Sequence, residues 1–152
     1  MPLATAGLML ALLLSALASG VAFSHILEIP GKRRMSPEQA IEVQQVLYVG
    51  YRLPAAVIEV GATVIALAAT LLVWGKGAEF WLGAAASAAL LGSMVVFATV
   101  TDRQNRRILA WRPDDPPSDW ARVRATWEAS HGVRAALFLA AVGLLAAAIR
   151  AA

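Results

Sequence analysis

The sequence predicts an all-α integral membrane protein, an up-down four-helix bundle with helical cytoplasmic extensions. Hydrophobic residues make up 59% of the 152 residues and charged residues only 15%, and the mean hydropathy is +0.65. A soluble domain carries about a quarter charged residues, whereas disordered chains are polar and rich in charge. The composition therefore argues against a soluble domain and excludes a disordered chain. In addition, the apolar residues fall into four runs.

The first three apolar runs each have the length of a membrane-spanning helix, which needs roughly 20 mostly apolar residues. Residues 2–24 and 80–101 contain no charge, and residues 54–74 contain one, Glu59. The first run could alternatively be a signal peptide, because Ala16-Leu17-Ala18 resembles a cleavage site, but no basic residue precedes the run. We therefore expect three spanning helices here.

The fourth run, residues 135–149, is uncharged but short. It reaches spanning length only if the helix starts near His131 and either includes Arg134 or lets the Arg134 side chain reach toward the membrane surface. We expect a single domain over residues 1–152, with spanning helices at about 3–28, 54–75, 79–105 and 119–150 and an extra helix at about 36–53.

Two polar segments connect the spanning helices on one side, residues 25–53 and 102–130. Ser36-Pro37-Glu38-Gln39 combines an N-cap residue, a proline at the first helical position and a glutamine three residues after the serine. The extra helix should therefore begin there and run toward Pro54, which is expected to kink it into the second spanning helix. Residues 113–117 predict a turn, after which Ser118 should cap the fourth helix.

Basic residues are unevenly distributed between the two sides of the predicted bundle. The net charge is +3 and the isoelectric point is about 10.0. The side opposite the polar segments holds only Lys76 and Arg150. By the positive-inside rule, the polar segments face the cytoplasm and both termini lie outside it, which fits a bacterial inner membrane protein. Topology accounts for the basic residues, so nucleic acid is not an expected partner. The polar segments hold Lys32, Arg33, Arg34, Arg52, Arg103, Arg106, Arg107, Arg112, Arg122 and Arg124.

Polar residues gather at one predicted depth, the cytoplasmic ends of the four helices. His25 and Glu28 end the first helix, and Glu128 and His131 begin the fourth. Residues three positions apart share a helix face, and polar groups inside a membrane bundle are costly and often functional. We expect six of these side chains to line one cavity near the cytoplasmic membrane boundary: His25, Glu28, Glu59, Asn105, Glu128 and His131.

Two stripes at three- and four-residue steps add aromatic and charged groups. An arginine between tryptophan rings allows cation–π stacking, and a flat aromatic ligand could use the same rings. Structural interpretations stay open, because Glu59 could pair with Arg52 or Arg134, the tryptophans could anchor the helix at the membrane interface and the histidines could be structural. The stripes are Gln45, Tyr48, Arg52, Glu59 and Thr63 in the second helix, and Trp120, Arg124, Trp127, His131, Arg134 and Phe138 in the fourth.

A spaced set of residues in the second half follows the order N, then W, then D-W-x-x-x-R-x-x-W-x-x-x-H-x-x-R: Asn105, Trp111, Asp119, Trp120, Arg124, Trp127, His131 and Arg134. This motif resembles that of the anthrone oxygenase-like family, small four-helix membrane proteins whose bacterial members are mostly uncharacterised. Residues 25–32 and 43–48 also resemble a bacterial branch. Many members have a proline shortly before the motif asparagine, whereas Asp102-Arg103-Gln104 precede it here, so the end of the third helix should differ.

The resemblance implies a cofactor-free oxygenase that oxidises an aromatic, anthrone-like substrate with O2, without a metal or flavin. The ring CH2 of an anthrone is acidic, so a positioned base can start the reaction and hydrogen-bond donors can stabilise the oxyanion. We expect His131 to be the base, oriented by Glu128 or Glu28, with His25 as the alternative base. The expected substrate-binding residues are Trp120 and Trp127 for stacking, Arg124, Arg134 or Asn105 for the oxyanion, and Glu59 and Tyr48.

The partners of such an oxygenase would be the lipid bilayer, a hydrophobic aromatic small molecule and O2. Two alternative functions stay open. The chain could be a cofactor-binding bundle, because bundles build metal sites from Glu-x-x-His pairs and because His25 and His131 could ligate one haem. It could also be a non-enzymatic subunit of a larger membrane complex, or form a homo-oligomer. The chain has no cysteine, which excludes disulfides and thiolate sites. The alternative metal ligands are His25, Glu28, Glu59, Glu128 and His131.

The charge bias makes the topology testable. A reporter that is active only in the cytoplasm, fused after Ala152, should be silent, because the C-terminus is expected outside. The same reporter inserted after Pro113 should be active. Activity of the C-terminal fusion together with silence of the loop fusion would show that the orientation is the reverse.

Overall fold

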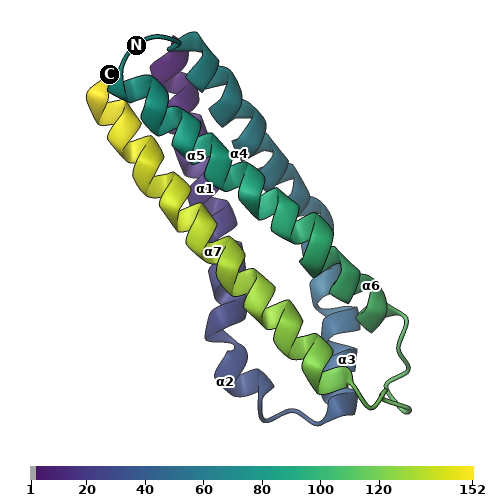
Figure 1. Cartoon of the computed structure of the whole chain (residues 1–152). Coiled ribbons are helices and arrows are strands. Elements are labelled where there is room, and N and C mark those ends of the chain that lie inside the picture. Colours follow the sequence, from purple (N-terminus) through teal and green to yellow (C-terminus); the bar gives the residue numbers. More distant parts are fainter. Residues whose placement is uncertain (1–2) are drawn as a thin grey trace.

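A computed structural model describes residues 3–152, so Met1 and Pro2, where the first apolar run begins, lie outside the described residues. Four long helices form an up-down bundle, with both termini at one end and α2, α3 and α6 at the other (Figure 1). This confirms the all-α four-helix fold. All four are long and apolar enough to cross a membrane, which supports an integral membrane protein. The bundle helices are α1 (Leu3–Leu27), α4 (Arg52–Leu72), α5 (Ala78–Val96) and α7 (Trp120–Ala151).

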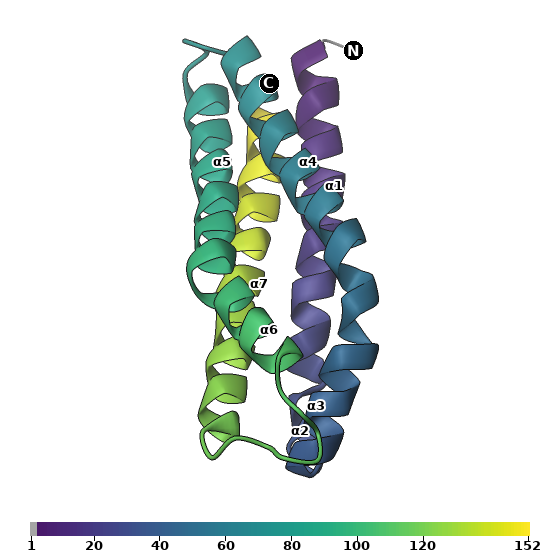
Figure 2. The same ribbon diagram turned by 90° about the vertical axis from the view of Figure 1, so that its right-hand side faces the viewer.

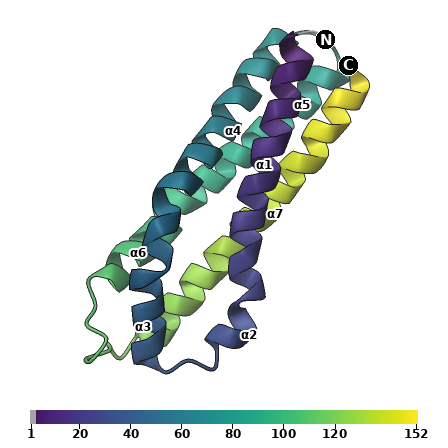
Figure 3. The ribbon, with the colours of Figure 1, turned by 180° about the vertical axis from the view of Figure 1, so that it is seen from behind.

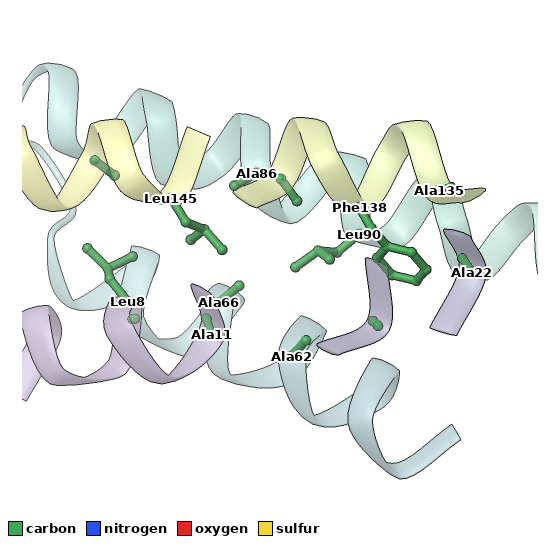
Figure 4. Packing of buried hydrophobic residues seen from close by; sticks show 14 residues of the cluster. Leu8, Ala11, Ala22, Ala62, Ala66, Ala86, Leu90, Ala135, Phe138 and Leu145 are labelled. Carbon is green, nitrogen blue, oxygen red and sulfur yellow. The ribbon is translucent and has the colours of Figure 1, made fainter. Parts of the chain in front are cut away.

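Each bundle helix packs against two neighbours. α1 and α5 both lie between α4 and α7, and Figure 3 shows α1 running along the bundle between these two helices. The buried core is rich in alanine, and its larger side chains, Leu8, Leu90, Phe138 and Leu145, point inward between the helices (Figure 4). Small residues let helix backbones approach closely, which is how helices associate where lipid removes the hydrophobic driving force.

Two glycines mark the closest approaches between helices. A Cβ atom built on Gly7 of α1 would lie 2.9 Å from the Cβ of Ala69 in α4. A Cβ atom built on Gly83 of α5 would lie 2.6 Å from the Oγ1 of Thr70, again in α4. Gly7 is the fifth residue of α1 and Gly83 the sixth of α5, so both contacts lie toward the end of the bundle that carries the termini. At this end α4 is therefore held close to α1 and to α5.

The first polar segment folds as expected at its start and differently at its end. After α2 (Ile29–Lys32), Ser36 and Gln39 form the capping box of α3 (Pro37–Val46). The expected extra helix to about residue 53 stops earlier, because a 3₁₀ turn, η1 (Tyr48–Tyr51), separates α3 from α4. The change of helix type thus precedes Pro54, which lies in the first turn of α4, where its missing N–H breaks no helical hydrogen bond.

The third helix is also interrupted where the sequence predicted a continuous helix over 79–105. A π turn, η2 (Phe97–Thr101), separates α5 from α6 (Asp102–Leu109). The expected cap at Ser118 is wrong, because Asp119 occupies the N-cap position of α7 without a capping hydrogen bond from its side chain. Its carboxylate instead accepts hydrogen bonds from Arg107 and Arg122. These two arginines hold the pKa of Asp119 below its usual value and tie α6 to the start of α7.

The close approach at Gly7 generates a stability prediction. Gly7→Ala should lower the free energy of unfolding by about 1–3 kcal/mol, because overpacking a well-packed interface forces backbone shifts. Gly20→Ala is the matched control in the same helix, since a Cβ atom built on Gly20 would have nothing within 4 Å, and alanine is the better helix former. Unfolding in mixed detergent micelles measures both. Equal stability of the two variants would contradict the close approach.

Candidate functional site

A cavity of about 340 Å³ lies at the end of the bundle where η1 and α6 pack. Ligand pockets in proteins typically occupy about 300–1,000 Å³, so this one matches a small molecule. All four bundle helices contribute to its walls. Many lining residues are apolar, among them Val21, Ala55, Val60, Met94 and Phe97. The aromatic and functional lining residues include His25, Tyr48, Tyr51, Glu59, Asn105, Trp127, His131 and Arg134.

A pair of histidines from α1 and α7 forms part of the cavity wall. His25 is 5% exposed and His131 is 7% exposed, and their ring centres lie 4.3 Å apart. The Trp127 ring packs against both, 4.9 Å from His25 and 4.3 Å from His131. Within residues 3–152, neither buried Nδ1 atom has a hydrogen-bond partner. A neutral imidazole has one nitrogen that accepts a proton, so the pair brings two such groups to an apolar cavity.

A carboxylate behind the cavity wall connects three elements. The Tyr48 hydroxyl donates a hydrogen bond to Glu28 Oε2, the Lys32 ammonium lies 2.7 Å from the same oxygen, and His25 Nδ1 lies 3.4 Å from it. The Lys32 ammonium is also 4.8 Å from the centres of both the Tyr48 and Trp127 rings. The sequence indicates Lys32 as a topology signal. Its i,i+4 spacing from Glu28 is the signal that could have indicated the Lys32–Glu28 ion pair. These contacts close the cavity toward α2 and α3.

A buried ion pair lies deeper in the bundle than the histidines. Arg134 of α7, which is 3% exposed, donates to Glu59 of α4 and, at 3.4 Å, to Ser93 of α5. Its guanidinium lies 5.0 Å from the ring centre of Phe97. The alternative in which Glu59 pairs with Arg134 is therefore the one observed, and Arg52 does not take that role. A buried charge must be paired, so this contact links three of the four bundle helices.

Hydrogen bonds hold Trp127 in place. Its Nε1 donates to Asn105 Oδ1 over 2.6 Å, and its backbone carbonyl accepts from Ser130, whose hydroxyl in turn accepts from Thr101. On the other side of the cavity, Gln45 donates to two carbonyl oxygens of the α6 end and clamps α3 against it. The sequence signals for Ser130, Thr101 and Gln45 were too general to assign these positioning roles.

Some expected site residues lie elsewhere. Of the six side chains expected in one cavity, His25, Glu59, Asn105 and His131 line it, whereas Glu28 and Glu128 do not. Glu128 does not orient His131, because it accepts a hydrogen bond from Arg124 beside a small recess behind Trp127. Trp120 packs against the Arg124 guanidinium at 5.5 Å. Trp120 and Arg124 therefore pair with each other or with Glu128 and do not contribute to the cavity wall, whereas Tyr48, Trp127 and Arg134 do.

The spacing of the donor groups bears on the cofactor alternatives. Within residues 3–152, no three histidine, aspartate or glutamate side chains lie close enough together to hold a metal ion. A haem ligated by both histidines must lie between the two rings, and ring centres 4.3 Å apart leave no room for it. The site is instead an apolar cavity with paired imidazoles, aromatic surfaces and nearby hydrogen-bond donors.

Comparison with models of known families, with curated proteins and with solved structures finds no match to this chain.

The buried ion pair makes a prediction about stability. Arg134→Met should lower the free energy of unfolding by about 3–5 kcal/mol, because it leaves the Glu59 carboxylate buried and unpaired. Replacing both residues, as Glu59→Leu with Arg134→Met, should restore most of the loss. Arg106→Met is the control, since it breaks an exposed pair with Asp102, which is worth at most about 1 kcal/mol. A larger loss in the double variant than in Arg134→Met would contradict the coupling. A detergent unfolding titration measures the wild type and the three variants.

Proposed function

We propose that the protein is a membrane-embedded, cofactor-free oxygenase that binds a flat aromatic molecule of the anthrone class in the cavity and oxidises it with O2. The observation that carries the proposal is the buried His25–His131 pair, whose rings lie 4.3 Å apart in the wall of a largely apolar cavity. The resemblance to the anthrone oxygenase-like family supports it, because four residues of that motif line this cavity, namely Asn105, Trp127, His131 and Arg134.

The proposed reaction needs a base and O2. An imidazole, His131 by preference, removes one proton from the acidic ring CH2, and the resulting carbanion forms a C–O bond with O2 and becomes a peroxide anion. This anion takes the proton back from the imidazolium. Removal of the second proton from the same carbon, with cleavage of the O–O bond, forms the new carbonyl and releases hydroxide, which takes up that proton to give water. One anthrone and one O2 thus give one anthraquinone and one water.

The surrounding residues have distinct proposed roles. Trp127 and Tyr51 offer aromatic surface to the ring system, since both line the cavity and aromatic pairs gain from offset or edge contacts. The Asn105 side chain accepts from Trp127 through its oxygen, so its amide NH2 is available to a substrate oxyanion. Arg134 keeps N–H groups beyond those bonded to Glu59 and Ser93, and these can stabilise the same charge.

The proposed setting is the bacterial inner membrane, with the cavity in the cytoplasmic half. The support is the excess of basic residues in the polar segments compared with Lys76 and Arg150 at the other side. Trp74 and Trp81 lie at that other side, each 71% exposed. Exposed tryptophans are enriched at membrane–water interfaces, so these two mark the outer boundary of the bundle.

The role of His131 is tested by oxygen consumption with anthrone in proteoliposomes, corrected for spontaneous oxidation. His131→Ala should lower the rate by about 10²–10⁴-fold, the usual contribution of a general base. Trp127→Phe should mainly raise KM, because stacking surface is reduced while the base remains. Trp120→Ala is the matched control, since Trp120 lies outside the cavity, and its rate should equal that of the wild type.

Three results would count against parts of this proposal. An unchanged rate in His131→Ala, with a large loss in His25→Ala, would transfer the base role to His25. Equal losses in Trp120→Ala and Trp127→Phe would show that the cavity is not where the substrate binds. Absence of oxidation by the folded wild-type protein, over a panel of acidic aromatic C–H compounds, would overturn the oxygenase proposal itself.

A further inference from the structure

One side of the cavity has a rim of exposed residues from three elements, α4, η2 and α6. The α4 side contributes Ala56 and Val60, and the other side contributes Ala98 of η2 and Leu109 of α6. All four are apolar, all four line the cavity, and Val60 and Leu109 are 46% and 44% exposed. Figure 2 shows α4 diverging from α5 toward the end that carries α2 and α3. The cavity thus opens sideways, between α4 and the η2–α6 segment.

The depth of this opening follows from two arginines on the same rim. Arg52 and Arg106 are exposed lining residues, and exposed arginines of membrane helices favour the level of the lipid headgroups. At a rise of 1.5 Å per residue, Ala56 and Val60 lie about 6 and about 12 Å deeper along α4 than Arg52. Ala98 lies about two turns deeper than Arg106 on the facing segment. The opening therefore extends from the headgroups into the hydrocarbon.

On the side of α2 and α3, by contrast, polar contacts close the cavity. The Lys32 ammonium fills the space between the Tyr48 and Trp127 rings, 4.8 Å from each ring centre. Glu28 accepts from Tyr48 and holds this arrangement together. Gln45 donates to the carbonyl oxygens of Ile108 and Trp111, both over 2.9 Å, and keeps α3 against α6.

From these two observations we infer that the ligand reaches the cavity sideways from the lipid leaflet, through the opening between α4 and the η2–α6 segment. This rests on the proposed function and specifies its substrate class: uncharged, apolar aromatic molecules that dissolve in the bilayer. Water-soluble, charged analogues with the same ring system would be excluded, because their charged group would have to cross the apolar rim without a partner.

The experiment measures how fast an unreactive aromatic probe enters the cavity. Anthracene lacks the acidic CH2 and partitions into lipid, and energy transfer from tryptophan to anthracene in nanodiscs reports its binding. Val60→Phe and Ala98→Phe narrow the rim and should slow association by about tenfold, as a barrier increase of about 1.4 kcal/mol does. Val64→Phe and Val95→Phe are the matched controls. Val64 is in α4 like Val60, and Val95 is in α5, three residues before Ala98. Both are exposed and lie outside the cavity lining.

Each outcome decides the inference. Two results together support the lateral route. Anthracene enters more slowly in both rim variants but not in the control variants, and in the wild type anthracene-2-sulfonate enters much more slowly than anthracene. Wild-type entry rates in both rim variants, with faster entry in Lys32→Ala, would overturn the lateral route and leave the proposed function standing. Absence of any saturable anthracene binding by the wild type would overturn both. Circular dichroism and monodispersity of each variant establish that it is folded.

Discussion

The ion pair between Arg134 and Glu59 is the contact on which the arrangement of the site depends. Two charges in an apolar bundle are tolerated only as a pair with further hydrogen bonds, and Ser93 supplies one of these. The pair therefore sets the register of α7 against α4 and α5. His131 and Trp127 lie three and seven residues before Arg134 on the same face of α7. The same register therefore places both side chains beside His25, in the wall of the cavity.

The two ends of the bundle follow different packing rules. Toward the termini, Gly7 and Gly83 allow α4 to approach α1 and α5 so closely that a methyl group would collide. At the other end, the π turn η2 interrupts the third helix, and Phe97, Ala98 and Thr101 of this turn line the cavity. A π turn adds a residue to one helical turn, redirects the side chains that follow it and is frequent at functional sites. Here it separates the tightly packed half from the hollow half.

Polar contacts around Glu28 hold together the elements at the hollow end of the bundle. The Glu28 Oε2 atom accepts a hydrogen bond from the Tyr48 hydroxyl, pairs with the Lys32 ammonium and lies near His25. These contacts hold η1, α2 and the end of α1 together behind the cavity wall. The Lys32 ammonium lies beside the Tyr48 and Trp127 rings while it stays paired with Glu28. These contacts close the cavity on the side of α2 and α3.

The sequence alone determined the features that depend on neighbouring residues. Spanning helices follow from the apolar runs, the start of α3 follows from the capping box of Ser36 and Gln39, and the shared depth of His25 and His131 follows from their places at helix ends. Helix spacing also placed Trp127, His131 and Arg134 on one face. Each of these depends on composition or periodicity within a few turns, which the order of residues contains.

Tertiary structure decided which groups meet, because pairing across the bundle depends on helix rotation and register. Glu59 had two candidate arginines, and only the packing of α7 against α4 selected Arg134. Glu128 shares a face with His131, yet Arg124, also on that face, takes its carboxylate. The breaks at η1 and η2 were not readable either. Gly50 in η1 and the β-branched residues of η2 have low helix propensity, but such residues also occur inside continuous membrane helices. The breaks occur where the chain bends around a cavity, and a cavity is a property of the assembled helices and not of any one segment.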